Sequence, residues 1–121
     1  MAWKFEHDVP VSIQITRRLR LEILNGKYSP GEQFPPVRQL AYEASVNPNT
    51  MQKALSSLES EKLLVSRGTV GRFVTDDVSV LTAARKKEQE EYMRLALGGA
   101  ADLGITKEDF INYIKESEEV L

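Results

Sequence analysis

Residues 34–58 read FPPVRQLAYEASVNPNTMQKALSSL and carry the clearest helix signals in the chain. Pro36 opens a short helix over residues 37–44, since a proline angle suits the start of a helix. A second helix begins at Asn47 and Pro48, with Asn47 as the N-cap and Pro48 in the first turn. Only Ser45 and Val46 separate the two helices. This spacing predicts a helix-turn-helix, two helices joined by a tight turn.

Apolar residues in both helices recur at helical spacing, which predicts one buried face on each. The inward residues of the first helix are Val37, Leu40 and Ala41. Those of the second are Met51, Ala54, Leu55 and Leu58, and that helix ends near Glu61.

The flanking sequence supplies a preceding helix and a following hairpin. Val11, Ile15, Leu19 and Ile23 recur every fourth residue and predict a helix that ends at Asn25-Gly26. A short extended piece follows at residues 33–34. Residues 63–67 and 72–75 predict two strands, joined by a turn with a glycine at each end. The order predicts an α+β, mostly α fold, a winged helix-turn-helix over residues 1–75.

Residues 76–121 predict a separate helical tail. A long helix over about 78–103 ends at Gly104, and Thr106 with Asp109 resembles a capping box for a last helix reaching about residue 119. Gly98-Gly99 inside the long helix costs roughly 1 kcal/mol per glycine. We expect either a kink at this pair or close packing of another backbone against it.

The apolar face of the tail is too small to form a core of its own. We therefore expect a two-helix dimerisation tail that buries this face in a homodimer, while Trp3 and Phe5 pack on the body or on a partner tail. The residues expected at the dimer contact are Leu81, Tyr92, Leu95, Ala96, Gly99, Phe110, Ile111 and Ile114.

The charges divide the chain in the same way. Residues 1–75 hold ten Lys and Arg against seven Asp and Glu, whereas residues 76–121 hold six against eleven. No acid occurs from 47 to 58 or from 62 to 75. Asn and Gln side chains can read adenine edges, and Lys can read guanine. The acid-free helix and hairpin therefore predict binding to double-stranded DNA.

The expected DNA-contacting residues come from both helices of the helix-turn-helix and from the hairpin. They are Arg38, Asn49, Thr50, Gln52, Lys53, Arg67, Gly68, Gly71 and Arg72. Their four cations, Arg38, Lys53, Arg67 and Arg72, are expected to converge on one surface. Arg17, Arg18 and Arg20 are expected to be ordinary surface charge.

Several function classes are disfavoured. The chain has no cysteine and no apolar run near the ~20 residues of a membrane span. Its first residues show no signal-peptide core, so we expect a cytoplasmic protein. His7 is the only histidine, and a metal site needs three or four ligands. With no nucleophile–base pair and no phosphate-cradling loop, we expect neither an enzyme, nor a cofactor, nor a metal.

Residues 10–75 resemble the DNA-binding domain of GntR-family bacterial transcription regulators. The resemblance rests on Pro10 to Ile15, Ile23 to Gly31, Phe34 to Ala41, Val46 to Leu55, Leu58-Glu59 and Gly71 to Val74. The Asn47 to Thr50 segment and the short tail resemble the small YtrA-type branch. The resemblance implies a transcriptional repressor that dimerises through its tail, contacts DNA through Arg38, Asn49, Thr50 and Lys53, and inserts the wing, Gly68 to Arg72, into the minor groove. Two such helices in one dimer imply an inverted-repeat operator.

One departure from the family pattern concerns the helix-turn-helix turn. The family commonly has Leu-Gly where this chain has Ala44-Ser45. Either Ser45 takes a positive φ, at a cost of roughly 1 kcal/mol, or the turn differs slightly.

Two other functions remain open from the sequence. The winged helix would be a protein-interaction module if it bound a partner in a salt-insensitive way. The chain would be a metabolite-gated regulator if an unknown small-molecule effector bound between tail and DNA domain and changed the dimer geometry.

Overall fold

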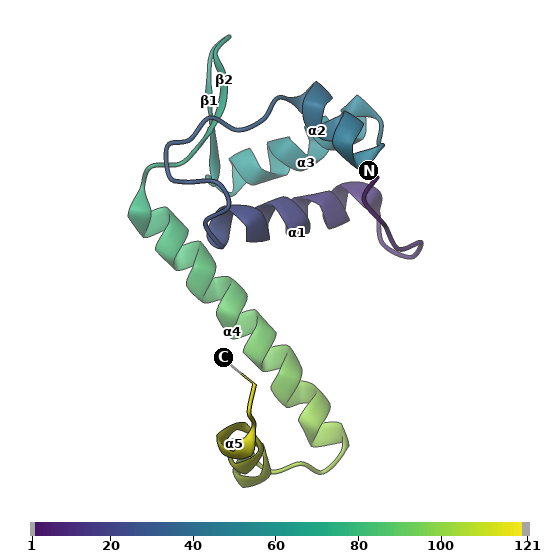
Figure 1. Ribbon diagram of the computed structural model, residues 1–121, viewed down its shortest axis with the longest axis vertical. Helices are drawn as coiled ribbons and strands as arrows, with labels where there is room; N and C mark the ends of the chain where they lie inside the picture. Colours follow the sequence, from purple (N-terminus) through teal and green to yellow (C-terminus); the bar gives the residue numbers. More distant parts are fainter. Residues whose placement is uncertain (1, 120–121) are drawn as a thin grey trace. The chain divides into compact units, whose positions relative to one another are not determined.

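The computed structural model describes residues 2–119 and is mostly helical (Figure 1). Within these residues, five helices and two strands follow one another. They are α1 (Val11–Leu24), α2 (Val37–Ala44), α3 (Pro48–Ser60), β1 (Leu64–Arg67), β2 (Gly71–Val74), α4 (Val78–Asp102) and α5 (Lys107–Glu116). The chain divides into two compact units, residues 1–85 and 86–121, and α4 contributes to both.

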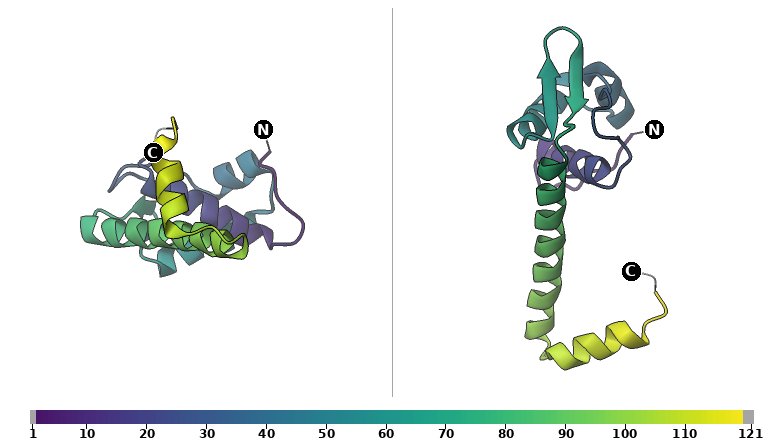
Figure 2. Two further views of the ribbon diagram at one scale, coloured as in Figure 1. Left: turned by 90° about the horizontal axis from the view of Figure 1, so that it is seen from below. Right: turned by 90° about the vertical axis from the view of Figure 1, so that its left-hand side faces the viewer.

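The first unit is a winged helix-turn-helix, as the sequence predicts. Its core is built from the apolar faces of α1, α2 and α3, and α1 lies alongside α3 (Figure 2). Ile15, Leu19, Met51, Leu55 and Leu58 are completely buried there. Each such side chain stabilises the fold by about 1.5–3 kcal/mol relative to an exposed one. The core therefore fixes α3 on the unit by its apolar face and leaves its polar face outside.

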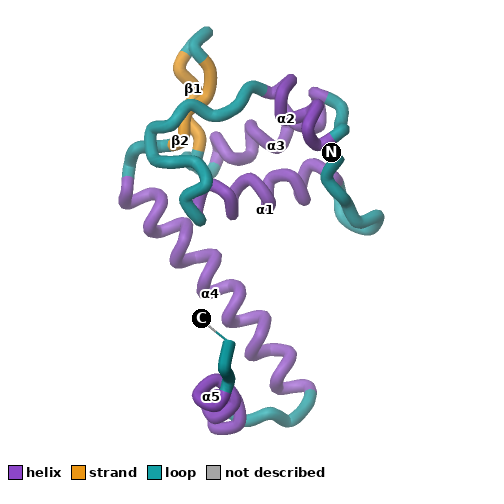
Figure 3. Tube along the Cα trace, viewed as in Figure 1, coloured by secondary structure: helices purple, strands orange, loops and turns teal. Residues whose placement is uncertain are grey.

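The wing is an antiparallel pair in which Leu64 lies opposite Val74 and Arg67 opposite Gly71. The connection between α1 and α2 runs beside β2 (Figure 3). The Phe34 N–H donates to the Arg72 carbonyl at 2.8 Å, and the Val74 N–H donates to the Glu32 carbonyl at 2.9 Å. The extended piece before α2 thus holds the wing from its second edge.

The turn between α2 and α3 has a left-handed residue. Ser45 adopts φ 57° and ψ 48°, and its N–H donates to the Tyr42 carbonyl at 3.2 Å. The Val46 N–H then closes the turn on the Ala41 carbonyl at 3.0 Å. Of the two alternatives for this departure from the family pattern, the structure shows the positive φ.

Side-chain caps set the starts of three helices. The Asn47 Oδ1 accepts the Asn49 N–H at 2.8 Å at the start of α3. At α4 the Asp77 Oδ1 accepts the Ser79 N–H at 3.0 Å. Thr106 and Asp109 form a reciprocal capping box at α5, which confirms the pattern read from the sequence.

The first turns of α4 belong to the first unit. Leu81 is only 5% exposed and lies in the core, and the Arg85 Nε donates to the Leu24 carbonyl at 3.0 Å. The compact unit therefore extends past residue 75. Leu81 was expected at the dimer contact, and the structure places its side chain in the core of its own chain.

The N-terminal aromatics also pack on their own body. The ring centres of Trp3 and Phe5 are 6.5 Å apart, and both residues lie against the core. The Arg18 guanidinium lies 3.8 Å from the centre of the Trp3 ring. A cation over an indole face is an attractive arrangement, and it accounts for one arginine of α1.

The second unit leaves most of its apolar side chains in solvent. Tyr92 is 79% exposed and Leu95 is 61% exposed. The helix α4 continues through Gly98-Gly99 without a break. A Cβ built on either glycine meets nothing within 4 Å, so no described part of this chain packs closely there. The last helix ends at Glu116, earlier than expected, because Ser117 is extended.

Candidate nucleic-acid interface

The polar face of α3 is the main feature of the candidate interface. Asn49, Gln52 and Lys53 are exposed and Thr50 is half-buried, while Met51 lies inside. This division follows from the helical period, because residues on one face are buried in the core. From residue 48 to residue 58 the helix carries no carboxylate. The exposed groups are thus an ammonium, amides and hydroxyls, which are the side-chain types that contact base edges and phosphates.

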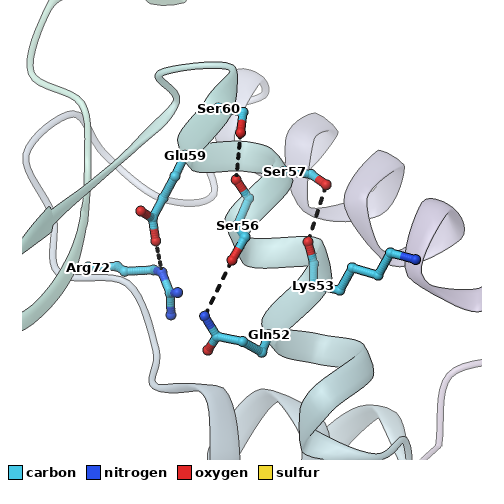
Figure 4. A network of polar contacts seen from close by, with 7 residues as sticks. All are labelled: Gln52, Lys53, Ser56, Ser57, Glu59, Ser60 and Arg72. Carbon is cyan, nitrogen blue, oxygen red and sulfur yellow. Dashed lines mark hydrogen bonds and ion pairs between the residues drawn. The ribbon is translucent and has the colours of Figure 1, made fainter.

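Side-chain contacts along α3 leave its central groups accessible (Figure 4). The Gln52 Nε2 donates to the Ser56 Oγ at 3.3 Å, a long bond between two exposed groups. The Ser57 Oγ donates back to the Lys53 carbonyl at 3.2 Å. Within residues 2–119, no hydrogen bond or ion pair engages the Lys53 ammonium or the Arg38 guanidinium. Both cations are exposed to solvent.

The wing cations are held by other residues. The Arg72 Nε donates to the Glu59 carboxylate near the end of α3, and its side chain is only 18% exposed. The Arg67 guanidinium lies 4.6 Å from the centre of the Phe73 ring. Ion pairing and ring stacking therefore hold both arginines against the first unit.

The wing turn depends on its two glycines. Gly68 has φ 54° and Gly71 has φ 126°, both in the region that favours glycine. A Cβ on Gly71 would lie 3.2 Å from the Gln33 Nε2, which donates to the Val70 carbonyl at 2.9 Å. Gln33 thus ties the tip of the wing to the connection before α2.

Two of the four expected cations, Lys53 and Arg72, extend to different sides of α3 (Figure 4). Arg72 and Gln52 lie on one side of α3, whereas Lys53 extends to the other side (Figure 4). Arg38 lies in the first turn of α2. Lys53 and Arg72 therefore offer positive charge on two sides of α3. This arrangement suits a duplex, whose two phosphate strands lie on either side of the groove that a helix enters.

Two residues of this surface were missed by sequence reasoning. Glu59 pairs with Arg72 across thirteen residues, and Gln33 bonds the wing across thirty-seven. Both contacts join residues that are far apart in the sequence, so no local spacing pattern predicts them.

Two of the three arginines of α1, Arg18 and Arg20, pair with carboxylates of the same unit. The Arg20 Nε donates to the Glu61 carboxylate at 2.6 Å, and Arg18 lies 3.8 Å from the Glu22 carboxylate. These contacts agree with their interpretation as surface charge.

A metal site and a membrane-spanning helix are both absent from the part of the chain that the structure describes. Over residues 2–119, no group of three or more His, Cys, Asp or Glu is placed to hold a metal ion. In the same residues, no helix combines the length and the apolar character needed to cross a membrane.

Comparison with known proteins gave a family match over the first unit. The family model described as "Bacterial regulatory proteins, gntR family" matches residues 12–74. The HTH-type transcriptional regulator Rv1152 of Mycobacterium tuberculosis is 32% identical over 88% of each chain. The HTH-type transcriptional repressor YtrA of Bacillus subtilis is 28% identical and covers 90% of this chain and 85% of its own. These relatives are regulators, not enzymes.

Solved structures give the same fold. A GntR family transcriptional regulator from Listeria monocytogenes has a TM-score of 0.88 at 28% identity, covering 94% of this chain and all of the other. The DNA-binding domain of AraR in complex with operator ORX1 has a TM-score of 0.56 at 27% identity, covering 60% of this chain and 93% of that domain. The AraR domain is therefore a solved example of this fold bound to operator DNA.

Proposed function

The chain belongs to the GntR family of bacterial regulatory proteins, and from this premise we propose that it represses transcription by binding an inverted-repeat operator as a homodimer. As a member of that family it is a DNA-binding transcriptional regulator. The observation that carries the finer proposal is the acid-free polar face of α3, which lies exposed on the core of the first unit. The protein acts in the cytoplasm, where bacterial DNA lies.

In the proposed complex α3 enters the major groove. Asn49 and Gln52 contact adenine edges, and Lys53 reaches a guanine or a phosphate. Thr50 contacts a thymine methyl group or a phosphate beside them. The AraR complex supports this role, since that DNA-binding domain is similar to most of the first unit and is bound to its operator.

Cations on either side of α3 contact the backbone. Arg38 neutralises a phosphate at the start of α2, while Arg67 and Arg72 follow the wing. The wing, with its turn at Gly68 and Gly71, enters the minor groove. Each phosphate neutralised adds about 0.9 to the slope of log K against log salt.

The homodimer forms through the second unit. Burying the exposed apolar side chains of α4 and α5 against a second copy removes them from water, which drives association. The open space beside Gly98 and Gly99 admits the close approach of another helix. The dimer contact comprises Tyr92, Leu95, Ala96, Gly99, Phe110, Ile111 and Ile114. A two-fold dimer presents two recognition helices and therefore matches an inverted repeat.

The proposal is tested with Lys53→Ala and Arg38→Ala in titrations against operator DNA. Each variant is expected to lose tight operator binding while circular dichroism and sedimentation stay unchanged, because both side chains are exposed. Lys87→Ala, an exposed cation of α4, is the matched control and is expected to bind like the wild type. Unchanged affinity in both test variants would rule out this surface as the DNA-binding site.

A further inference from the structure

An open hollow on the first unit lies between α2 and the start of α3. Arg38 and Tyr42 line it from α2, Ser45 from the turn, and Pro48 from α3. Tyr42 is 86% exposed, the highest value among the large apolar and aromatic side chains that the structure describes. Its ring therefore contributes almost nothing to the core of its own chain.

The position of Tyr42 relates it directly to the candidate interface. Tyr42 follows Arg38 by four residues on a helix, so the two side chains are neighbours on one face. Of the described residues that line the hollow, none is a carboxylate. Glu43, the next residue, accepts a hydrogen bond from the Gln39 Nε2 at 3.3 Å and does not line the hollow.

The chemistry of this hollow fits a phosphate. It combines a permanent cation, Arg38, with two hydroxyl groups, those of Tyr42 and Ser45, which are neutral hydrogen-bond donors. DNA-binding proteins contact phosphate oxygens with these side-chain types. The hollow also borders Pro48, the first residue of the helix assigned to the major groove.

We propose that Tyr42 is a further DNA contact, whose hydroxyl donates a hydrogen bond to the backbone phosphate that Arg38 neutralises. This inference rests on the proposed function, because it places the operator backbone in the hollow. The ring lines the hollow beside the guanidinium, and its hydroxyl adds a hydrogen-bond donor without adding charge. Tyr42 thereby contributes affinity on every DNA sequence.

The test separates a neutral contact from a charged one. Tyr42→Phe keeps the ring and removes the hydroxyl, so the fold is preserved. Loss of one hydrogen bond from a neutral donor to a charged phosphate is expected to weaken binding about tenfold to a hundredfold. The loss should be equal on operator and scrambled DNA, and the salt slope should not change. Arg38→Ala should instead flatten the slope by about 0.9. Tyr113→Phe, an exposed tyrosine of α5, is the matched control and should bind like the wild type.

A second arm asks whether a free phosphate ion competes for the same donors. Titrations are repeated in inorganic phosphate and in Tris-chloride at equal ionic strength. Weaker wild-type binding in phosphate is expected, because the ion competes with the DNA phosphate for the Tyr42 hydroxyl. A weakening that Tyr42→Phe does not reduce would mean that the ion does not use this hydroxyl, and would overturn the inference.

The two proposals fail in different ways. If the wild type shows no salt-dependent binding to any DNA, the proposed function fails. If the wild type binds and Tyr42→Phe matches it on both DNAs, only the role of Tyr42 fails. A loss confined to operator DNA would assign Tyr42 to base reading and would also overturn the phosphate contact.

Discussion

Replacing Ser45 by glycine should stabilise the protein, although the substitution removes a side chain. Ser45 is exposed and adopts φ 57° at the turn between α2 and α3. The left-handed conformation is about 1–2 kcal/mol less favourable for a residue with a Cβ, whereas glycine adopts it at almost no cost. Within residues 2–119, the Ser45 hydroxyl makes no hydrogen bond that the substitution would remove.

The size of the effect follows from two opposing terms. Relief of the left-handed conformation favours the glycine variant, while the greater freedom of glycine in the unfolded chain opposes it by about 0.4–1 kcal/mol. Together these ranges give a net gain for Ser45→Gly of about 0–1.6 kcal/mol, centred near 0.8 kcal/mol. In a unit of 85 residues the central value corresponds to a rise in Tm of about 3–6 °C.

The same substitution at Ser57 gives a control of opposite sign. Ser57 is exposed inside α3, where glycine costs about 0.5 kcal/mol more than serine. Urea and thermal unfolding of both variants, followed by circular dichroism, should show Ser45→Gly above the wild type and Ser57→Gly below it. If Ser45→Gly destabilises as Ser57→Gly does, the turn in solution does not have the left-handed residue, and the reasoning is refuted.

Three further predictions concern charge, assembly and acid sensitivity. Glu59→Gln removes the carboxylate that holds Arg72, so binding to scrambled DNA should strengthen and its salt slope should steepen by up to about 0.9 in anisotropy titrations; an unchanged slope would contradict a role for this pair at the DNA surface. Leu95→Asp places a charge on the apolar face of the tail and should convert dimers to monomers in analytical ultracentrifugation, with unchanged helicity. Hydrogen bonds from Ser79 lower the pKa of Asp77 below its ordinary value. The stabilisation of α4 by this cap is therefore present above the ordinary pKa of Asp and is lost as pH falls through the lowered pKa. NMR titration of the Asp77 carboxyl should show the lowered pKa, and an unshifted pKa would contradict the cap.

The sequence predicts the helix-turn-helix closely because its boundaries depend on local chemistry. Proline and asparagine act within one or two residues of where they stand, so Pro36 and Asn47 place the starts of α2 and α3. The bounds Val37–Ala44 agree with the expectation for that reason. Where the local signal is weak, as beyond residue 116, the expected helix end is wrong.

Contacts between segments that are distant in the sequence cannot be predicted from local sequence patterns. Leu81 has the same apolar character as Leu95, and the sequence does not say that one is buried by its own core and the other is exposed. The pairing of Arg72 with Glu59 likewise depends on the wing folding back to the end of α3. The expected DNA-contacting residues therefore remain predictions about function, while the structure adds which cations already have partners.

The most direct measurement is fluorescence anisotropy of the wild-type protein on DNA from upstream of its own gene, with scrambled DNA beside it, at two salt concentrations. We predict tight binding to the upstream DNA, a clear preference over the scrambled sequence, and a marked loss of affinity at the higher salt concentration. Equal, weak binding to both DNAs, or binding that does not respond to salt, would contradict operator recognition by the α3 surface.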